Sequence, residues 1–314
     1  MEFLIWLFTQ VGIGFVNIAY GLINIPGFLK ALIGIWDLSS LEEKQQLIRF
    51  IYFGGHNAFF FVVMDIFLVI TVIGIFRNNF LWAVVRILEG CMNGIGRLAA
   101  WAGLLMVLQQ IMVVFLQRIF LVPGISIGPF GYTFYRDLSW YSEELKFYNA
   151  MVVGLCASYT FVQGGHVRVD LFYAGAKFRT KRIVDMFGSL FFILPSMTLV
   201  WFYGWFFLWR GLVTPKIAAA NTLDLLEKKA RILKWNVETI AFSLNGFDAY
   251  FLFKILLISF AGLMFVQGWT FFFRSYLEFK EGPESEGKYV DKDIMGDEDA
   301  EDLAAEEMHV GAAE

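Results

Sequence analysis

Six apolar stretches in this chain are long enough, or nearly long enough, to cross a membrane. A helix needs about 20 apolar residues to cross a hydrocarbon layer about 30 Å thick. Backbone groups in lipid must be paired within the protein, so only helices or closed barrels span a bilayer. The two-residue alternation of barrel strands is absent. We therefore predict an all-α polytopic membrane protein with spans at roughly residues 4–34, 56–76, 98–121, 146–163, 184–209 and 251–273.

Composition supports this prediction and excludes an ordinary soluble domain. The chain is 58% hydrophobic and 17% charged, whereas soluble domains are about 45–50% apolar and about 25% charged. The first stretch, "MEFLIWLFTQVGIGF", lacks a basic start and a small-residue cleavage site, so we expect it to stay in the membrane. Its glycines, Gly12, Gly14 and Gly21, and the pair Pro26-Gly27 would let it kink or turn back.

The segment between the second and third spans has the pattern of an amphipathic helix. In "RNNFLWAVVRILEGCMNGIGR" the apolar residues recur at helical spacing, with arginines between them. This pattern is typical of a helix that lies in the lipid headgroups. The apolar positions are Phe80, Leu81, Val84, Val85 and Leu88, and the basic ones are Arg77, Arg86 and Arg97.

Charge is distributed unevenly along the chain. Residues 281–314 contain thirteen acidic residues and two lysines, a net charge of −11, against −4 for the whole chain. Residues 1–280 therefore carry a positive excess. We expect the acidic tail to be disordered and solvated, because it has too little apolar surface to fold.

Basic residues in the short loops predict the orientation. In a six-span arrangement, the loops after the second and fourth spans lie on the same side, and both are rich in arginine and lysine. Short loops with this excess face the cytoplasm. We therefore place both termini in the cytoplasm. The basic residues are Arg77, Arg86 and Arg97 in the first loop, and Arg168, Lys177, Arg179, Lys181 and Arg182 in the second.

Signatures of catalysis and of resident cofactors are absent from the sequence. It has no phosphate-binding glycine loop and no nucleophile elbow. Three histidines and two cysteines are too few and too scattered for a haem, a zinc cluster or a disulfide framework. We expect no enzyme activity, no cofactor in this chain and no nucleic-acid partner. The residues are His56, His166 and His309, with Cys91 and Cys156.

Asp65 is the most conspicuous ionisable residue within a predicted span. Such residues are costly in lipid and are often functional. One interpretation is a buried hydrogen bond between helices. The other is an independent ion-coupled transporter or channel, in which His56 and Asn57 would stand at the mouth of the helix. No internal repeat of the kind common in secondary transporters is visible. A third hypothesis, a membrane anchor of a respiratory complex, would require haem or quinone ligands.

A segment in which polar and apolar residues alternate follows the fourth span. In "YTFVQGGHVRVDLFY" an apolar run ends at two glycines, which can take the left-handed conformation that closes a helix. His166 could then bond the last carbonyls of that helix. Arg168 would face lipid phosphates or a carboxylate, with Asp170 as an internal partner.

The sequence of this segment closely resembles the signature of the small membrane subunit of tripartite ATP-independent periplasmic (TRAP) transporters. The core is Gly-His-Val-Arg-Val-Asp, and weaker elements occur in the expected order over about residues 77–275. The matching positions are Tyr159, Thr160, Gly165, His166, Val167, Arg168, Val169, Asp170, Tyr173, Asp185 and Pro195, with Glu144 before them and Trp235, Glu238, Thr239 and Lys254 after them.

The resemblance implies a role in a three-part importer of the bacterial inner membrane. In that family a periplasmic binding protein captures small organic anions such as carboxylates, and a large membrane subunit carries the substrate and sodium sites. The small subunit is a scaffold beside the large one. Gly165, His166, Arg168, Asp170, Glu144, Trp235, Glu238 and Lys254 would then contact lipid or a subunit.

The resemblance also implies a division of the chain. Residues 77–280 would form the four-helix core with its interfacial helix, and residues 281–314 the acidic tail. Residues 1–76 are an N-terminal extension with one or two spans, and a helix inserted near residues 220–234 is a second departure from the family pattern.

Overall fold

The structure, a computed structural model, describes residues 2–25, 34, 37–127, 134–164, 176–241 and 243–291. Within these residues, six helical stretches are long and apolar enough to cross a membrane, which confirms the predicted fold class. They are α1 (Glu2–Ile23), α4 (Asn57–Phe76), α5 (Asn78–Val114) with its π-helical end Phe115–Ile119, α6 (Leu138–Gln163), α8 (Phe178–Gly188) joined to α9 (Leu194–Arg210) by a π-helical turn at Ser189–Ile193, and α11 (Phe251–Glu281).

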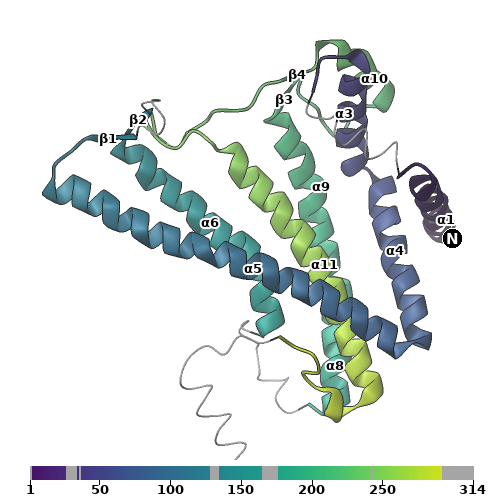
Figure 1. The fold of residues 1–314 in the computed structure, drawn as a ribbon. Coiled ribbons are helices and arrows are strands. Elements are labelled where there is room, and N and C mark those ends of the chain that lie inside the picture. The colour runs from purple at the N-terminus through teal and green to yellow at the C-terminus, as the bar shows by residue number, and fades with distance from the viewer. Residues whose placement is uncertain are drawn as a thin grey trace, which may run out of the picture.

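Helix α11 is the centre of the bundle and contacts α5, α6, α8 and α9. In Figure 1, α5 runs obliquely across the bundle and α6 lies along it, while α4 stands on the opposite flank with α1 outside it. Helix α1 continues through Gly12, Gly14 and Gly21 without a break and ends at Ile23. The expected kink is therefore not seen in this part of the chain.

The predicted interfacial helix is not a separate element. Residues 78–119 form one continuous helical stretch, so the segment 77–97 leads directly into the third span. Its apolar face does not lie on lipid. Leu81, Trp82 and Val85 are buried in a cluster with Phe273 and Leu277 of α11. The periodicity was correctly interpreted as amphipathic, but the partner of the apolar face is protein.

Two helices outside the spans pack against each other at one end of the bundle (Figure 1). Helix α3 (Leu41–Gly54) was not predicted from the sequence, whereas α10 (Leu223–Lys229) and the 3₁₀ turn Ala230–Ile232 confirm a helix within residues 220–234. Arg49 of α3 forms an ion pair with Glu227 of α10 at 2.8 Å. The buried side chains of this contact are Leu47, Ile48 and Ile51 from α3, Leu226, Ala230 and Leu233 from the insert, and Trp205, Leu208 and Trp209 from α9.

Local capping explains where α3 and α4 begin. Ser40 and Glu43 form a reciprocal capping box at the start of α3, in which each side chain accepts a hydrogen bond from the other's backbone N–H. The bond from the Ser40 N–H lowers the pKa of Glu43. His56 caps α4 by accepting a hydrogen bond from the N–H of Ala58 at Nδ1. The Nδ1 atom of His56 is therefore occupied by the hydrogen bond that caps α4.

Two short antiparallel strand pairs close loops at the same end as α3 and α10 (Figure 1). In the first pair, β1 (Gly124–Ile127) and β2 (Phe134–Asp137) align Gly124 with Asp137. In the second, β3 (Val213–Thr214) and β4 (Lys234–Trp235) align Val213 with Trp235. The second pair fixes the two ends of the segment that carries α10.

The acidic segment was expected to be disordered from Glu281, and this boundary is wrong. Helix α11 extends to Glu281, a 3₁₀ turn follows at Pro283–Ser285, and the chain folds back over the bundle as far as Asp291. Tyr289 packs on Trp82 and on the guanidinium of Arg86, and Asp291 pairs with Arg97 at 2.9 Å. Arginines of the bundle hold this acidic stretch in place. Residues 292–314 lie outside the described residues.

Replacing Gly54 by alanine should weaken the contact between α3 and α9. A Cβ atom at this position would lie 2.2 Å from a ring carbon of Trp205, whose indole N–H donates to the carbonyl of Ile51. Overpacking of this kind costs about 1–3 kcal/mol. We expect Gly54→Ala to lower the thermal unfolding midpoint of the purified protein in detergent.

Gly90→Ala is the matched control, because a Cβ at Gly90 of α5 meets open space. Alanine favours a helix over glycine by about 0.5–1 kcal/mol, so this variant should unfold at or slightly above the wild-type temperature. Equal midpoints for the two variants would contradict the packing described here.

Candidate functional site

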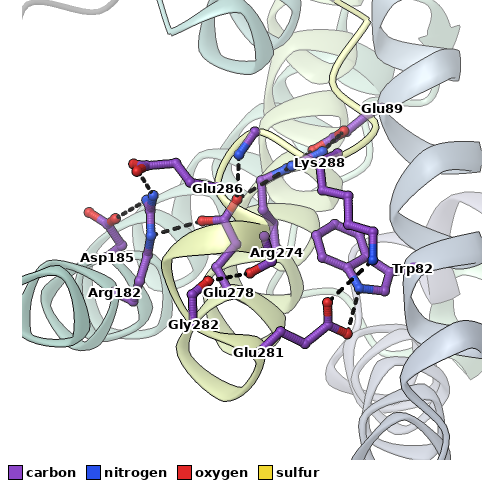
Figure 2. Close-up of polar contacts among 12 residues, drawn as sticks. Trp82, Glu89, Arg182, Asp185, Arg274, Glu278, Glu281, Gly282, Glu286 and Lys288 are labelled. Atoms are coloured by element: carbon purple, nitrogen blue, oxygen red, sulfur yellow. Dashed lines mark hydrogen bonds and ion pairs between the residues drawn. The ribbon is translucent and has the colours of Figure 1, made fainter. Parts of the chain in front are cut away.

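A network of charged side chains lies at the end of the bundle where α8 and α11 meet the start of α5 (Figures 1 and 2). Its members come from four segments that are far apart in the sequence. They are Glu89 of α5, Arg182 and Asp185 of α8, Arg274 and Glu278 of α11, and Glu286 in the segment after α11.

Arg274 stands at the centre of the network and joins α11 to α5. Its Nε donates to one carboxylate oxygen of Glu89 at 2.7 Å, and its Nη2 donates to the other at 2.5 Å. This two-point geometry suits a guanidinium and a carboxylate. The remaining Nη1 lies 3.5 Å from Glu278 and 3.0 Å from the carbonyl oxygen of Lys288. All three charged side chains are buried.

Arg182 extends the network from α11 to α8 and to the C-terminal segment. Its guanidinium lies 2.8 Å from Glu278, 3.3 Å from Asp185 and 2.6 Å from Glu286 (Figure 2). Glu278, only 2% exposed, is therefore shared by both arginines. The charges alternate in sign along the path from Glu89 to Asp185.

The energetics of buried charge indicate that this network stabilises the packing of the four segments. Removing charges from water costs several kcal/mol per ion, which is offset only when each ion is paired with good geometry. Here each buried carboxylate faces a guanidinium, so none is left to bind an incoming cation. No group of three or more His, Cys, Asp or Glu residues in the described part of the chain is arranged to hold a metal ion. The network can clamp four segments together.

The central predicted residues, Gly165, His166, Arg168 and Asp170, lie outside the described residues. Their neighbour Gly164 is described, and it closes α6 in the left-handed conformation with φ at 76°. This confirms the predicted helix end at the glycine pair. The predicted roles of His166 and Arg168 stay predictions.

The structure brings together three other predicted residues at the opposite end of the bundle. The ammonium group of Lys254 forms an ion pair with Glu238 and lies over the ring of Phe207. Trp235 packs near Trp209 in the same region. The Lys254 side chain is only 5% exposed and is paired with Glu238 from the loop after β4.

Glu144 and Asp65 belong neither to the ion-pair network nor to the cluster of Lys254, Glu238 and Trp235. Glu144 on α6 accepts a hydrogen bond from Gln109 of α5 at 2.9 Å. Asp65 on α4 is fully buried against Gly14 of α1. Its carboxyl oxygens have no hydrogen-bond partner among the described residues, so the predicted hydrogen bond between helices is not found there. His56 lies nine residues before Asp65 on the same helix, roughly 13 Å along its axis, and does not form a site with it.

The sequence analysis missed the three residues at the centre of the network. Arg274 and Glu278 are four residues apart, a spacing that places them on one face of a helix, and both follow the predicted end of the last span. That spacing could have predicted the contact between Arg274 and Glu278 from the sequence. Glu89 gave no such signal, because its partner lies 185 positions along the chain.

Fold and site together define a multi-pass helical membrane protein held by internal ion pairs. Residues 130–242 match the family described as "Tripartite ATP-independent periplasmic transporters, DctQ component". Residues 130–242 are therefore similar to the small membrane component of TRAP transporters, and we call this matched region the DctQ domain. The searches of curated proteins and of solved structures found no match.

The matched region is narrower than the resemblance deduced from motifs, which covered about residues 77–275. It contains α6, α8, α9 and the segment with α10, and includes the Gly-His-Val-Arg-Val-Asp phrase. Helices α1, α3, α4, α5 and α11 lie outside it. Three of the buried ionic residues of the network, Glu89, Arg274 and Glu278, therefore come from outside the matched region, and Arg182 from within it.

Replacing Arg274 by methionine should severely destabilise the protein. The variant leaves Glu89 buried without its cation, and breaking a buried ion pair in this way costs about 3–5 kcal/mol. We expect a low membrane yield and a clearly lower thermal unfolding midpoint in detergent. Arg77→Met, at an exposed position, is the control and should behave like the wild type.

The double variant Glu89→Leu/Arg274→Met separates loss of charge balance from loss of packing. It removes both members of the pair, while Glu278 keeps Arg182 as its partner. Replacement of a whole buried pair by apolar groups is often nearly neutral, so most of the lost stability should return. A double variant as unstable as Arg274→Met would overturn the ion-pair interpretation.

Proposed function

We propose that this DctQ component is a stationary scaffold beside the large membrane subunit of a sodium-driven importer of small organic anions. It has no substrate or sodium site of its own. The observation that carries the proposal is the placement of its buried charges. Apart from Asp65, the buried ionic groups in the described residues lie toward helix ends and have polar partners within the chain.

Between those ends, the helices are joined by apolar and aromatic contacts. Phe67 of α4 stacks on Trp269 of α11 with ring centroids 5.1 Å apart, and Phe161 of α6 meets the edge of Phe271 at 4.8 Å. Such contacts stabilise a fixed arrangement. They offer no row of convergent oxygens for a passing ion, which supports the scaffold role over that of an independent transporter.

The DctQ family implies association with the large DctM membrane component and the periplasmic DctP component. We propose that the network end faces the cytoplasm of a bacterial inner membrane, because Arg77, Lys177, Arg179 and Lys181 gather there. The end with α3, α10 and the strand pairs then faces the periplasm, where the binding protein arrives. Both termini are cytoplasmic in this orientation.

The proposed parts of the chain follow the predicted division, with the tail boundary moved. Residues 1–76 form an extension docked on the core through α3 and α4. Residues 77–291 form the core, with its fold-back segment, and the remaining acidic residues form the tail. Arg168 and its neighbours, together with Glu144, are proposed contacts to lipid or to the large subunit. Glu238, Lys254 and Trp235 anchor the loop after β4.

Reconstitution tests the proposed function directly. The chain alone, the large subunit alone and the assembled pair would be placed in liposomes with the binding protein and a panel of radiolabelled carboxylates and sugar acids. We expect uptake driven by an inward sodium gradient only from the assembled pair. Uptake by the chain alone would refute the scaffold role.

Asp65→Asn in the assembled pair addresses the second candidate function. The one observation that favours an independent transporter is that the Asp65 carboxyl group is buried without a partner in the described residues. Asparagine has nearly the same shape and carries no charge, so the scaffold role predicts near wild-type uptake. Abolished uptake with intact assembly would favour an ion path through Asp65.

A further inference from the structure

The carboxyl group of Asp65 lies where α1 packs on α4, near the middle of both membrane-spanning helices. Asp65 is fully buried, and neither of its carboxyl oxygens has a hydrogen-bond partner among the described residues. The backbone of Gly14 faces this group. A Cβ atom at Gly14 would lie 3.0 Å from the carboxyl carbon of Asp65 and would overlap one of its oxygens. Glycine at position 14 therefore makes room for the acid.

This contact is the point at which α1 is attached to the bundle. Gly14 is the one buried residue of α1 among those that the structure describes, and α4 is the helix against which α1 packs. One ring contact accompanies it, in which Trp6 meets the edge of Phe61 with centroids 5.8 Å apart. Because the rest of α1 buries little surface, loss of the contact at Gly14 would free the helix.

Two amide side chains flank Gly14 on the same face of α1. Gln10 precedes Gly14 by four residues and Asn17 follows it by three, a spacing that places all three on one side of a helix. Both amides are half-buried. The face of α1 that meets Asp65 is therefore polar and uncharged, and it offers hydrogen-bonding groups to a neutral acid.

No charged group of the described residues is bonded to Asp65. The ionisable groups on the surrounding helices lie toward helix ends, are exposed or are already paired. They are Glu2 and Tyr20 of α1, Arg49 and Tyr52 of α3, His56 of α4, Arg86 and Glu89 of α5, Tyr203 and Arg210 of α9, and Lys254, Arg274 and Glu278 of α11. An ionised Asp65 would thus have no counter-ion.

Physical chemistry selects a proton as the ligand of this carboxyl group. An isolated carboxylate is so costly in an apolar medium that the group becomes neutral instead. A hard metal ion takes six or more oxygen ligands, about three times what one carboxyl group provides. No group of three or more His, Cys, Asp or Glu residues in the described part of the chain could hold one. A proton needs a single oxygen.

We propose that Asp65 binds a proton and that this proton holds α1 on α4. In the acid form the carboxyl group is neutral and fits the space left by Gly14. Transfer of the proton to water leaves a carboxylate, and no other bond changes. Because a charge in the membrane must reach water or a partner, α1 then moves away from Asp65. The proposal does not depend on the scaffold role.

Distances between α1 and α9 at two pH values test this proposal. Spin labels would be attached at Val16→Cys and Leu199→Cys, both exposed positions, in the full-length protein in lipid nanodiscs, with Cys91 and Cys156 replaced by serine. Electron–electron double resonance would be recorded at about pH 5 and about pH 9, a range in which buried carboxyl groups titrate. We expect one distribution at the lower pH. At the higher pH we expect a second one, longer by about 8–10 Å, the spacing of two packed helices.

Variants at the contact separate the proton from other causes. Asp65→Asn cannot ionise and should keep the short distance at both pH values, and Asp65→Ser gives the same reading if the first variant does not fold. Gly14→Ala overlaps the carboxyl oxygen and should show the long distance at both. Gly12→Ala is its matched control, because a Cβ at Gly12 meets open space, and it should follow the wild type. The double variant Gly14→Ala/Asp65→Ala removes the overlap and should regain the short distance.

Three results would overturn the proposal. The first is a wild type with the same distribution at both pH values. The second is a pH-dependent shift that persists in Asp65→Asn or Asp65→Ser, because another group would then be responsible. The third is a Gly14→Ala variant that keeps the short distance at the lower pH, which would show that α1 is not held at Gly14.

Discussion

The sharing of Glu278 by two buried arginines is the interaction on which the arrangement of this protein depends. Arg182 reaches it from α8 and Arg274 from α11, and Arg274 also holds Glu89 of α5 at both carboxylate oxygens. Buried ions are tolerated only when they are matched, so the three helices cannot part without leaving some of these charges unpaired. The same network recruits Glu286, and with it the start of the acidic segment.

At the other end, α3 precedes the matched residues 130–242 and α10 lies within them. The apolar faces of these two helices bury one another beside the tryptophans of α9. Each of these two helices depends on the other, and on α9, to bury its apolar face. Helix α3 thus contacts the matched region at this end of the bundle, and α4 contacts α11, outside the matched region, through Phe67 and Trp269.

Sequence reasoning succeeded where the signal was local and failed where it was not. Span length and apolar composition predicted six membrane helices, and the glycine pair predicted the end of α6, since both depend on neighbouring residues. The same reasoning placed the apolar face of residues 77–97 on lipid, because periodicity shows that a face is apolar without showing what covers it. Pairing of Glu89 with Arg274 depends on tertiary structure alone. The tail boundary was misplaced because composition does not reveal that Arg97 and Arg182 bind its acidic residues.

We propose that this subunit is a rigid scaffold whose network of buried charges is paired within the chain. Its most direct test is the distance between spin labels at Cys91 of α5 and at Phe187→Cys of α8, both exposed positions, with Cys156 replaced by serine. Electron–electron double resonance would be recorded on the complex with the large subunit, with and without sodium and transported anion. A rigid scaffold predicts one distance distribution under all conditions. A shift of about one helical turn, about 5 Å, would show that α5 and α8 move relative to each other during transport and would contradict a rigid scaffold.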